Sequence, residues 1–96
     1  MLSDEQFLVS SAGQGNAAMV AHLITQGVNI NYIDALGRTA LHAALTQGHA
    51  DVVKVLLNLG ADPNIKRRDG WSCLEIAKYK ENASELQSLL REAGAK

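Results

Sequence analysis

The sequence predicts an all-α fold in which short helix-turn-helix units stack into a solenoid. Three observations support this prediction: the apolar residues are mostly Ala, Leu and Val, the chain contains a single proline, and one residue pattern occurs three times. Hydrophobic residues make up 47% of the 96 residues, but aromatic residues only 4%. Small and unbranched apolar side chains favour close packing of helices over a β-rich core. A chain of this length is expected to form one small domain.

The residue pattern returns with a period of 33 residues. A shift by this period aligns Leu8 with Leu41 and Leu74, and several glycines coincide at the same offset. A two-helix unit of this size cannot bury its apolar stripe alone, so the units must pack on one another. We therefore divide the single domain, residues 1–96, into a cap-like repeat 1 (1–31), repeat 2 (32–64) and a cap-like repeat 3 (65–96).

The first helix of each repeat is expected to begin at a hydroxyl residue, which caps free backbone N–H groups of the first turn. These residues are Thr39 in repeat 2, Ser72 in repeat 3 and, in repeat 1, Ser3 or a neighbouring residue. The segments SDEQ, from Ser3, and SCLE, from Ser72, have the form of capping boxes. Gly15 and Gly48 are expected to end the first helix, because glycine adopts the left-handed conformation without steric cost.

A second helix is expected after each of these turns. Asn16, His49 and Asn82 occupy the position before it, and the segment NASE, from Asn82, has the form of another N-cap. Between residues 52 and 57, valines and leucines recur with the spacing of an apolar helix stripe. Gly60 is expected to end this helix, and the residues that follow it have the composition of a turn.

Repeat 2 resembles an ankyrin repeat. Its residues DALGRTALHAALTQGHADVVKVLLNLGADPN follow the pattern of that family nearly throughout, and the flanking repeats follow it in part. Ala40 and Cys73 stand where the family usually has proline, Glu81 replaces a glycine, and Gly94 lies one position late, which together indicate a loosened C-terminal cap. The resemblance implies an ankyrin-repeat solenoid with projecting β-turn finger loops. It also implies non-catalytic binding of proteins along the fingers and the concave first-helix surface.

The net charge of −1 gives no electrostatic reason to expect nucleic acid or a membrane as a partner. The charge is uneven, because residues 1–64 carry two basic and five acidic residues, whereas residues 65–96 carry seven basic and five acidic ones. A single cysteine excludes an internal disulfide framework. We find neither a secretory signal nor the roughly 18 to 20 apolar residues of a membrane span. We expect a soluble protein of the cytoplasm, with the nucleus as the alternative.

Histidine and cysteine residues do not combine into the pattern of a catalytic or metal site. The resemblance implies that His42 hydrogen-bonds its own turn and the adjacent repeat, and we expect His49 to brace the inter-helix turn. No two histidines have the i, i+4 spacing of metal ligands. Cys73 is either an activated thiol at a helix N-terminus or, as we favour, a small residue in the position of a proline. We predict no enzymatic activity, no cofactor and no metal.

Polar residues of the turns have a conformational interpretation and a functional one. We expect Asp34, Asp62 and Asp69 to bond the backbone of their own turns. The basic run that starts at Lys66 fits a nuclear address or a phosphate contact, but we favour a solvated turn tip. Asn64 resembles the asparagines that are hydroxylated in ankyrin repeats, although a turn asparagine is the interpretation that we favour.

Residues that the repeat pattern does not require are the candidates for partner binding. They are Ile33, Leu36, Arg38, Thr46, Gln47, Lys66, Arg68, Asp69, Trp71, Tyr79 and Lys80. We place the centre of the surface at Trp71 and Tyr79, because Trp, Tyr and Arg are enriched among interface hot spots. Arg38, Lys66 and Arg68 favour another protein with an acidic or mixed surface, and we expect neither a small-molecule substrate nor nucleic acid. In the alternative interpretation, Trp71 packs over its own finger and only stabilises it.

Self-association is a second functional possibility. A stack of three repeats has apolar ends, and the substitutions between Glu81 and Gly94 would expose the C-terminal one. Otherwise we expect a monomer.

Overall fold

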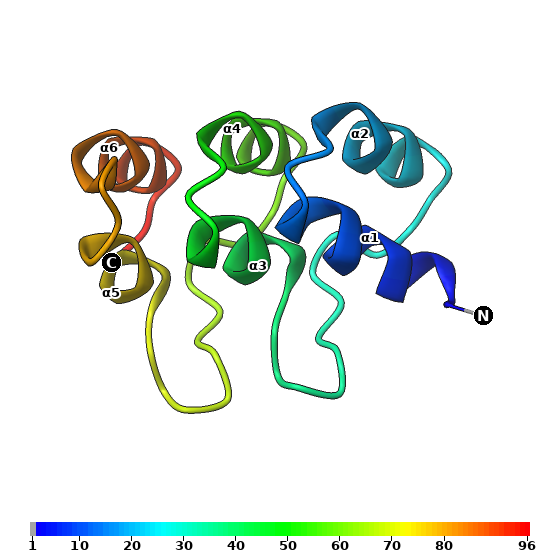
Figure 1. Ribbon diagram of the computed structural model, residues 1–96, viewed down its shortest axis with the longest axis horizontal. Coiled ribbons are helices and arrows are strands. Elements are labelled where there is room, and N and C mark those ends of the chain that lie inside the picture. The colour runs from blue at the N-terminus through cyan, green and yellow to red at the C-terminus, as the bar shows by residue number, and fades with distance from the viewer. Residues whose placement is uncertain (1) are drawn as a thin grey trace.

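The computed structural model describes residues 2–96 and places six helices within them. They are α1 (Asp4–Gly13), α2 (Ala17–Thr25), α3 (Ala40–Thr46), α4 (Ala50–Asn58), α5 (Cys73–Lys78) and α6 (Ala83–Glu92). No strand occurs in these residues, so the predicted all-α class is confirmed. Figure 1 shows the helices as three pairs that lie side by side, one pair from each repeat.

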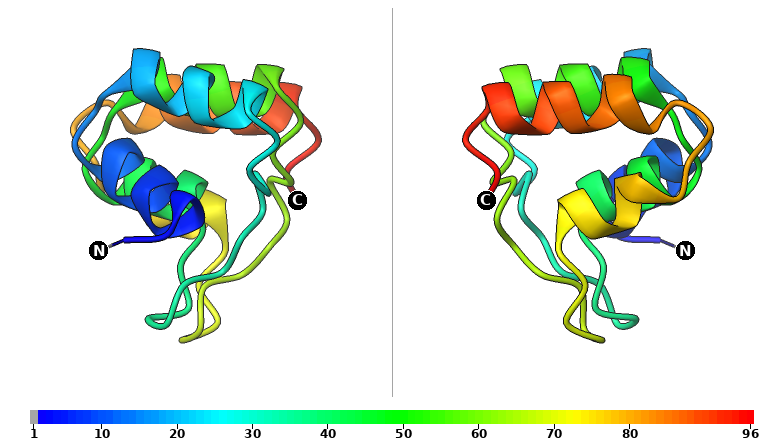
Figure 2. Two further views of the ribbon diagram at one scale, coloured as in Figure 1. Left: turned by 90° about the vertical axis from the view of Figure 1, so that its right-hand side faces the viewer. Right: turned by 90° about the vertical axis from the view of Figure 1, so that its left-hand side faces the viewer.

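The helices form two layers with loops projecting from one edge. Helices α1, α3 and α5 pack in one layer, and α2, α4 and α6 in the other. The loops after α2 and α4 extend away from both layers, which gives the L-shaped profile of Figure 2. We call residues 33–38 finger 1 and residues 66–71 finger 2. The surface formed by α1, α3, α5 and the two fingers is called the inner face.

The predicted hydroxyl caps begin the helices of the first layer. Ser3, Thr39 and Ser72 each accept a hydrogen bond from the backbone N–H three residues later, and each is part of a capping box. In repeat 2 the third residue of the box is His42, whose Nδ1 accepts from the N–H of Thr39 at 3.0 Å. A histidine therefore does the work that glutamine and glutamate do in the outer repeats.

One predicted cap is wrong. Asn82 makes no capping bond to α6, and its Nδ2 instead donates to the carbonyl of Gly48 at 3.0 Å. At the same repeat position, Nε2 of His49 donates to the carbonyl of Gly13 at 3.1 Å. Both side chains reach back to satisfy a carbonyl in the inter-helix turn of the preceding repeat. In repeat 1, by contrast, Asn16 caps α2 by accepting from the N–H of Met19.

A single apolar core runs through the stack between the two layers. Its largest side chains are fully buried: Leu8, Leu41, Leu45, Leu56, Leu86 and Leu90. They alternate with small residues such as Ala44 and Ala77, which let the first-layer helices approach closely. The leucine pattern of the sequence therefore corresponds to the observed core.

The two ends of the stack differ. Leu86 and Leu90 are buried at the C-terminal end, where Glu75 and Lys78 are exposed. The expected loosening of this end is not observed. At the N-terminal end, by contrast, Leu2 is exposed and Phe7 is 42% exposed. Phe7 occupies the repeat position of Ala40 and Cys73, and both of these are buried against a preceding repeat.

Candidate functional site

Three open grooves follow the first-layer helices. One of about 270 Å³ lies between α1 and finger 1, and one of about 240 Å³ lies between α1 and α3. A third, of about 450 Å³, lies at the C-terminal ends of α3 and α5. Six of the predicted partner-binding residues line these grooves: Leu36, Arg38, Thr46, Gln47, Tyr79 and Lys80. The remaining five, Ile33, Lys66, Arg68, Asp69 and Trp71, lie exposed on the fingers.

Finger 1 is closed by an ion pair. Asp34 Oδ2 lies 3.0 Å from Arg38 Nε, and Asp34 Oδ1 accepts from the N–H groups of Leu36 and Arg38 at 2.9 Å each. Burial raises the pKa of Asp34, but the hydrogen bonds and positive charge of Arg38 outweigh burial, so the pKa lies below its usual value. The guanidinium of Arg38, although predicted to contact a partner, is thus already paired within its own finger.

Finger 2 has the same backbone closure with different side chains. Arg67 donates from Nε and Nη2 to the two carboxylate oxygens of Asp69, at 3.0 and 2.6 Å. The hydrogen bond from Arg67 lowers the pKa of Asp69. Asp69 also accepts from the N–H of Trp71. Arg67 is not among the residues predicted to bind a partner. Its alignment with Asp34, where a base replaces an acid at one repeat position, could have identified it.

An aromatic pair continues from finger 2 onto α5. The rings of Trp71 and Tyr79 lie 5.5 Å apart between centroids, and their side chains come from positions eight residues apart in the chain. Arg67 lies over the Trp71 ring at 5.5 Å, and Lys78 Nζ lies 5.8 Å from the centre of the Tyr79 ring. We call Arg67, Trp71, Tyr79 and Lys78 the cation–aromatic row. Trp71 is 37% exposed and Tyr79 is 69% exposed, so both rings reach solvent.

The two fingers touch through backbone. The N–H of Arg68 donates to the carbonyl of Gly37 at 3.3 Å, and a Cβ on Gly37 would lie 2.3 Å from that of Arg68. Gly37 also has a φ of +78°, which L side chains rarely adopt. This contact fixes finger 2 against finger 1, and Arg68, although exposed, has its Nε close to Gly37.

Buried polar side chains in repeats 2 and 3 hold the fingers to the helices. His42 Nε2 donates to the carbonyl of Ile65 at 2.7 Å, and its Nδ1 is the acceptor in the Thr39 capping box. Burial lowers the pKa of His42, which favours the neutral ring that these two bonds require. Burial raises the pKa of Cys73 to about 12, so its thiol is not activated. The predicted bond of His42 to the adjacent repeat is confirmed.

The amide of Asn64 is bonded on both sides. Its Nδ2 donates to the carbonyl of Gly94 at 3.1 Å, and its Oδ1 accepts from the N–H of Lys96 at 2.9 Å. Asn31, at the same repeat position, accepts from the N–H of Asp62. Asparagine at this position therefore joins consecutive repeats. Hydroxylation of Asn64 stays a prediction, which mass spectrometry of the native protein would test.

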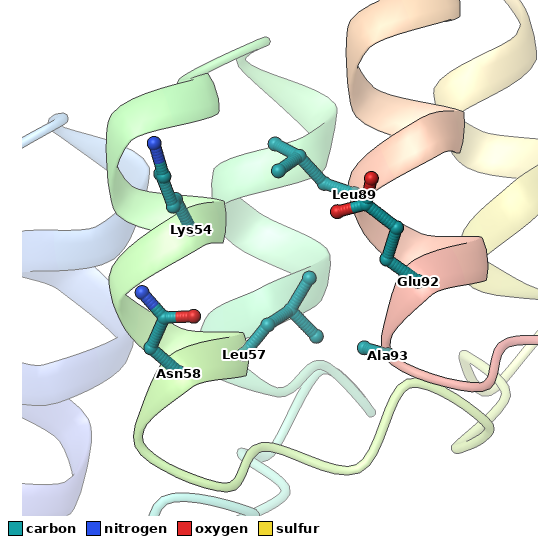
Figure 3. Close-up of a pocket in the computed structure, with 6 residues that line it drawn as sticks. All are labelled: Lys54, Leu57, Asn58, Leu89, Glu92 and Ala93. Atoms are coloured by element: carbon teal, nitrogen blue, oxygen red, sulfur yellow. The ribbon is translucent and has the colours of Figure 1, made fainter.

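A further groove, of about 470 Å³, lies on the other layer, between α4 and α6. Leu57 and Leu89 project into it, and Lys54 and Glu92 lie near its rim (Figure 3). None of its lining residues was predicted to bind a partner. Nowhere in residues 2–96 do three His, Cys, Asp or Glu side chains gather as metal ligands would. The same residues include no helix long and apolar enough to cross a bilayer.

Comparison with known proteins agrees with this architecture. Residues 7–96 match the family described as ankyrin repeats, in three copies. A crystal structure of an ankyrin repeat domain from Acinetobacter baumannii covers 93% of this chain with a TM-score of 0.86 and 37% identity. The match spans 47% of that chain.

Curated relatives give the same assignment. The Notch-regulated ankyrin repeat-containing protein of Xenopus tropicalis is 45% identical over 51 residues, which are 53% of this chain and 45% of the relative. An ankyrin repeat-containing protein of Schizosaccharomyces pombe is 34% identical over 79% of this chain and 37% of its own length. The chain thus spans less than half the length of these relatives. With its three stacked helix pairs, its capping boxes and its projecting fingers, the chain belongs to the ankyrin repeat family.

Proposed function

We propose that this chain is a non-catalytic module that binds a partner protein through its fingers and inner face. Ankyrin repeats are in general protein–protein interaction modules and are generally non-catalytic. In this chain, the polar residues that a catalytic site would need are used to cap helices and to join repeats. Thr39, His42, His49 and Asn82 all have such bonds.

The exposed contact of Trp71 with Tyr79 carries this proposal. A tryptophan and a tyrosine that lie together in solvent leave apolar area uncovered, and rings of this kind supply much of the binding free energy at protein interfaces. Grooves lined by Leu36, Thr46 and Gln47 extend the same surface along the stack. Their open shape suits a protein segment better than an enclosed small molecule.

The charge distribution favours an acidic or mixed partner surface. Lys66, Arg68 and Lys80 take part in no ion pair within residues 2–96. Arg38 and Arg67 are already paired with carboxylates, so they have less capacity to attract a partner. We therefore assign the attraction of an acidic partner to Lys66, Arg68 and Lys80 rather than to Arg38.

Capture of the native partner tests this function. The protein is immobilised as wild type and as a Trp71→Ala, Tyr79→Ala double variant, and the thermal stability of each form is measured. We expect the variant to lose its partner and to stay folded, because Tyr79 is largely exposed. Leu59→Ala is the matched control, since Leu59 is an exposed apolar residue at the end of α4. Unchanged capture together with lost stability would show that Trp71 only supports its finger.

Self-association is the alternative, and the exposure of Leu2 and Phe7 favours it over a purely monomeric chain. Sedimentation at several concentrations would then detect an oligomer, and Phe7→Ser would dissociate it. A monomer at every concentration excludes this alternative.

A further inference from the structure

We propose that the cation–aromatic row binds a partner segment in which an apolar side chain is flanked by carboxylates. This inference rests on the proposed protein-binding function and specifies the chemistry of the partner. Contacts join Arg67 to Trp71, Trp71 to Tyr79 and Tyr79 to Lys78, so each of the two rings has a cation near it. Each step of the row spans between 5.5 and 5.8 Å.

The centre of the row fits an apolar side chain. The two ring planes are tilted by 44°, so they do not stack face to face and part of each ring stays open to solvent. An aliphatic or aromatic side chain placed against both rings would bury this area. Burial of apolar surface is the main favourable contribution to most protein associations.

The surroundings of the row fit carboxylates. Finger 2 and α5 carry four basic residues, Lys66, Arg67, Arg68 and Lys78, and Lys80 follows α5. Arg67 alone among them forms an ion pair in the described structure, with Asp69. Glu75, the nearest other carboxylate on α5, is held by the capping box of Ser72. Lys66, Arg68, Lys78 and Lys80 form no ion pair in the described residues. The basic residues of finger 2 and α5 also outnumber the carboxylates Asp69 and Glu75, which suits a partner that carries acidic residues beside an apolar one.

Finger 1 supports the inference by contrast. At the repeat position of Trp71 it carries Arg38, and at the position of Arg67 it carries Asp34, so the two charges neutralise one another. No aromatic ring occurs in finger 1, and Thr46 stands at the position of Tyr79. The chemistry that would recognise an acidic, apolar segment therefore occurs in repeat 3 and not in repeat 2.

The test uses the intact chain and the fluorescence of Trp71, its single tryptophan. The probe is the heptapeptide Ser-Glu-Ser-Leu-Ser-Glu-Ser, because alternate side chains of an extended chain lie on one face. Two matched peptides carry glutamine in place of glutamate, or serine in place of leucine. We expect the probe to bind about threefold to tenfold more tightly than either matched peptide. Added salt should reduce the advantage over the glutamine peptide.

Variants locate the binding on the row. Lys78→Gln should weaken binding of the glutamate peptide and leave the glutamine peptide unchanged. Lys54→Gln is the matched control, since it removes the same charge from the exposed side of α4. Tyr79→Ala should weaken binding of both leucine peptides. Because Lys78 and Tyr79 are exposed, thermal unfolding should confirm that these variants keep their fold.

Three outcomes would overturn the inference. Equal binding of the glutamate and glutamine peptides would show that carboxylates are not recognised. Unchanged binding of the glutamate peptide by Lys78→Gln would show that the peptide does not bind at the row. A stronger fluorescence change with oligothymidylate than with the peptide would identify the row as a platform for nucleotide bases. In each case, partner capture that still depends on Trp71 and Tyr79 would leave the protein-binding function intact. Partner capture that does not depend on Trp71 and Tyr79 would contradict the proposed function, whatever the peptide results are.

Discussion

Finger 1 and finger 2 share a backbone and differ in chemistry. In each, the N–H of the second residue donates to the carbonyl of the last at 2.9 Å, and a glycine with positive φ precedes that last residue. Each finger has an ion pair, between Asp34 and Arg38 in finger 1 and between Arg67 and Asp69 in finger 2. In finger 2 the cation also lies over the aromatic ring of Trp71. Backbone hydrogen bonds and glycine therefore determine the shape of the finger. The side chains at its ends are free to diverge, and that divergence gives repeat 3 its distinct surface.

The largest expected difference between the fingers concerns their glycines. Gly37→Ala should lower the free energy of unfolding by about 3 kcal/mol, because it combines an unfavourable φ with an overlap against Arg68. Gly70→Ala has a similar φ, but a Cβ there would meet no atom within 4 Å, so we expect about 1 kcal/mol. Urea unfolding measures both. Equal losses would mean that the contact between the fingers contributes nothing.

The bond that holds finger 2 to α3 should make stability depend on pH. His42 has a lowered pKa in the folded protein, so the unfolded chain binds its proton first as the pH falls. The contribution of His42 to the free energy of unfolding should be fully present above about pH 6.5 and should decrease as the pH falls below this value. Asp34 of finger 1 also has a lowered pKa, but its contribution is lost only below about pH 3.8.

Variants of histidine separate these two ranges. His42→Ala should cost about 2 kcal/mol at neutral pH, since the N–H of Thr39 and the carbonyl of Ile65 lose their partner. In this variant the free energy of unfolding should also decrease less as the pH falls below about 6.5. His22→Ala, which removes an exposed histidine of α2, should keep the decrease. A decrease that persists in His42→Ala would assign it to another group.

The smallest expected difference concerns the finger carboxylates. Asp34→Asn should cost about 1 kcal/mol, because this side chain, 11% exposed, accepts from Leu36 and Arg38. Asp69→Asn should have a smaller effect, since Asp69 is 51% exposed and its pair with Arg67 is screened by water. Thermal unfolding of both variants under one condition measures the order. A larger loss for Asp69→Asn would mean that exposure does not decide how much each finger carboxylate contributes.

Much of the fold could be predicted from local sequence. Ser3, Thr39 and Ser72 cap helices because a hydroxyl can bond an N–H three residues away, and such bonds need no distant partner. The period of the leucines determines which side chains are buried, since it fixes the face of each helix. The pairing of Trp71 with Tyr79 in one candidate site also followed from the repeat, which places both on the inner face.

Contacts between repeats were less predictable. Asn16, His49 and Asn82 share one repeat position, yet only Asn16 caps its own helix. The other two find a carbonyl of the preceding repeat within reach, and no local rule states which partner a side chain will have. The same reason explains why the exposed apolar end was expected at the wrong terminus: exposure of Phe7 depends on what is packed against it.

Spacing along the chain was enough to predict the all-α repeat, the helix starts and the core leucines, and to select Trp71 and Tyr79. The pairing of Arg38 with Asp34, the positions of Arg67 and Lys78 near the two aromatic rings and the contact of Arg68 with Gly37 became visible only in the folded chain. The physical reason is that charge pairing and ring contacts depend on distances of a few ångströms in space. The folded backbone determines those distances, and the order of residues does not.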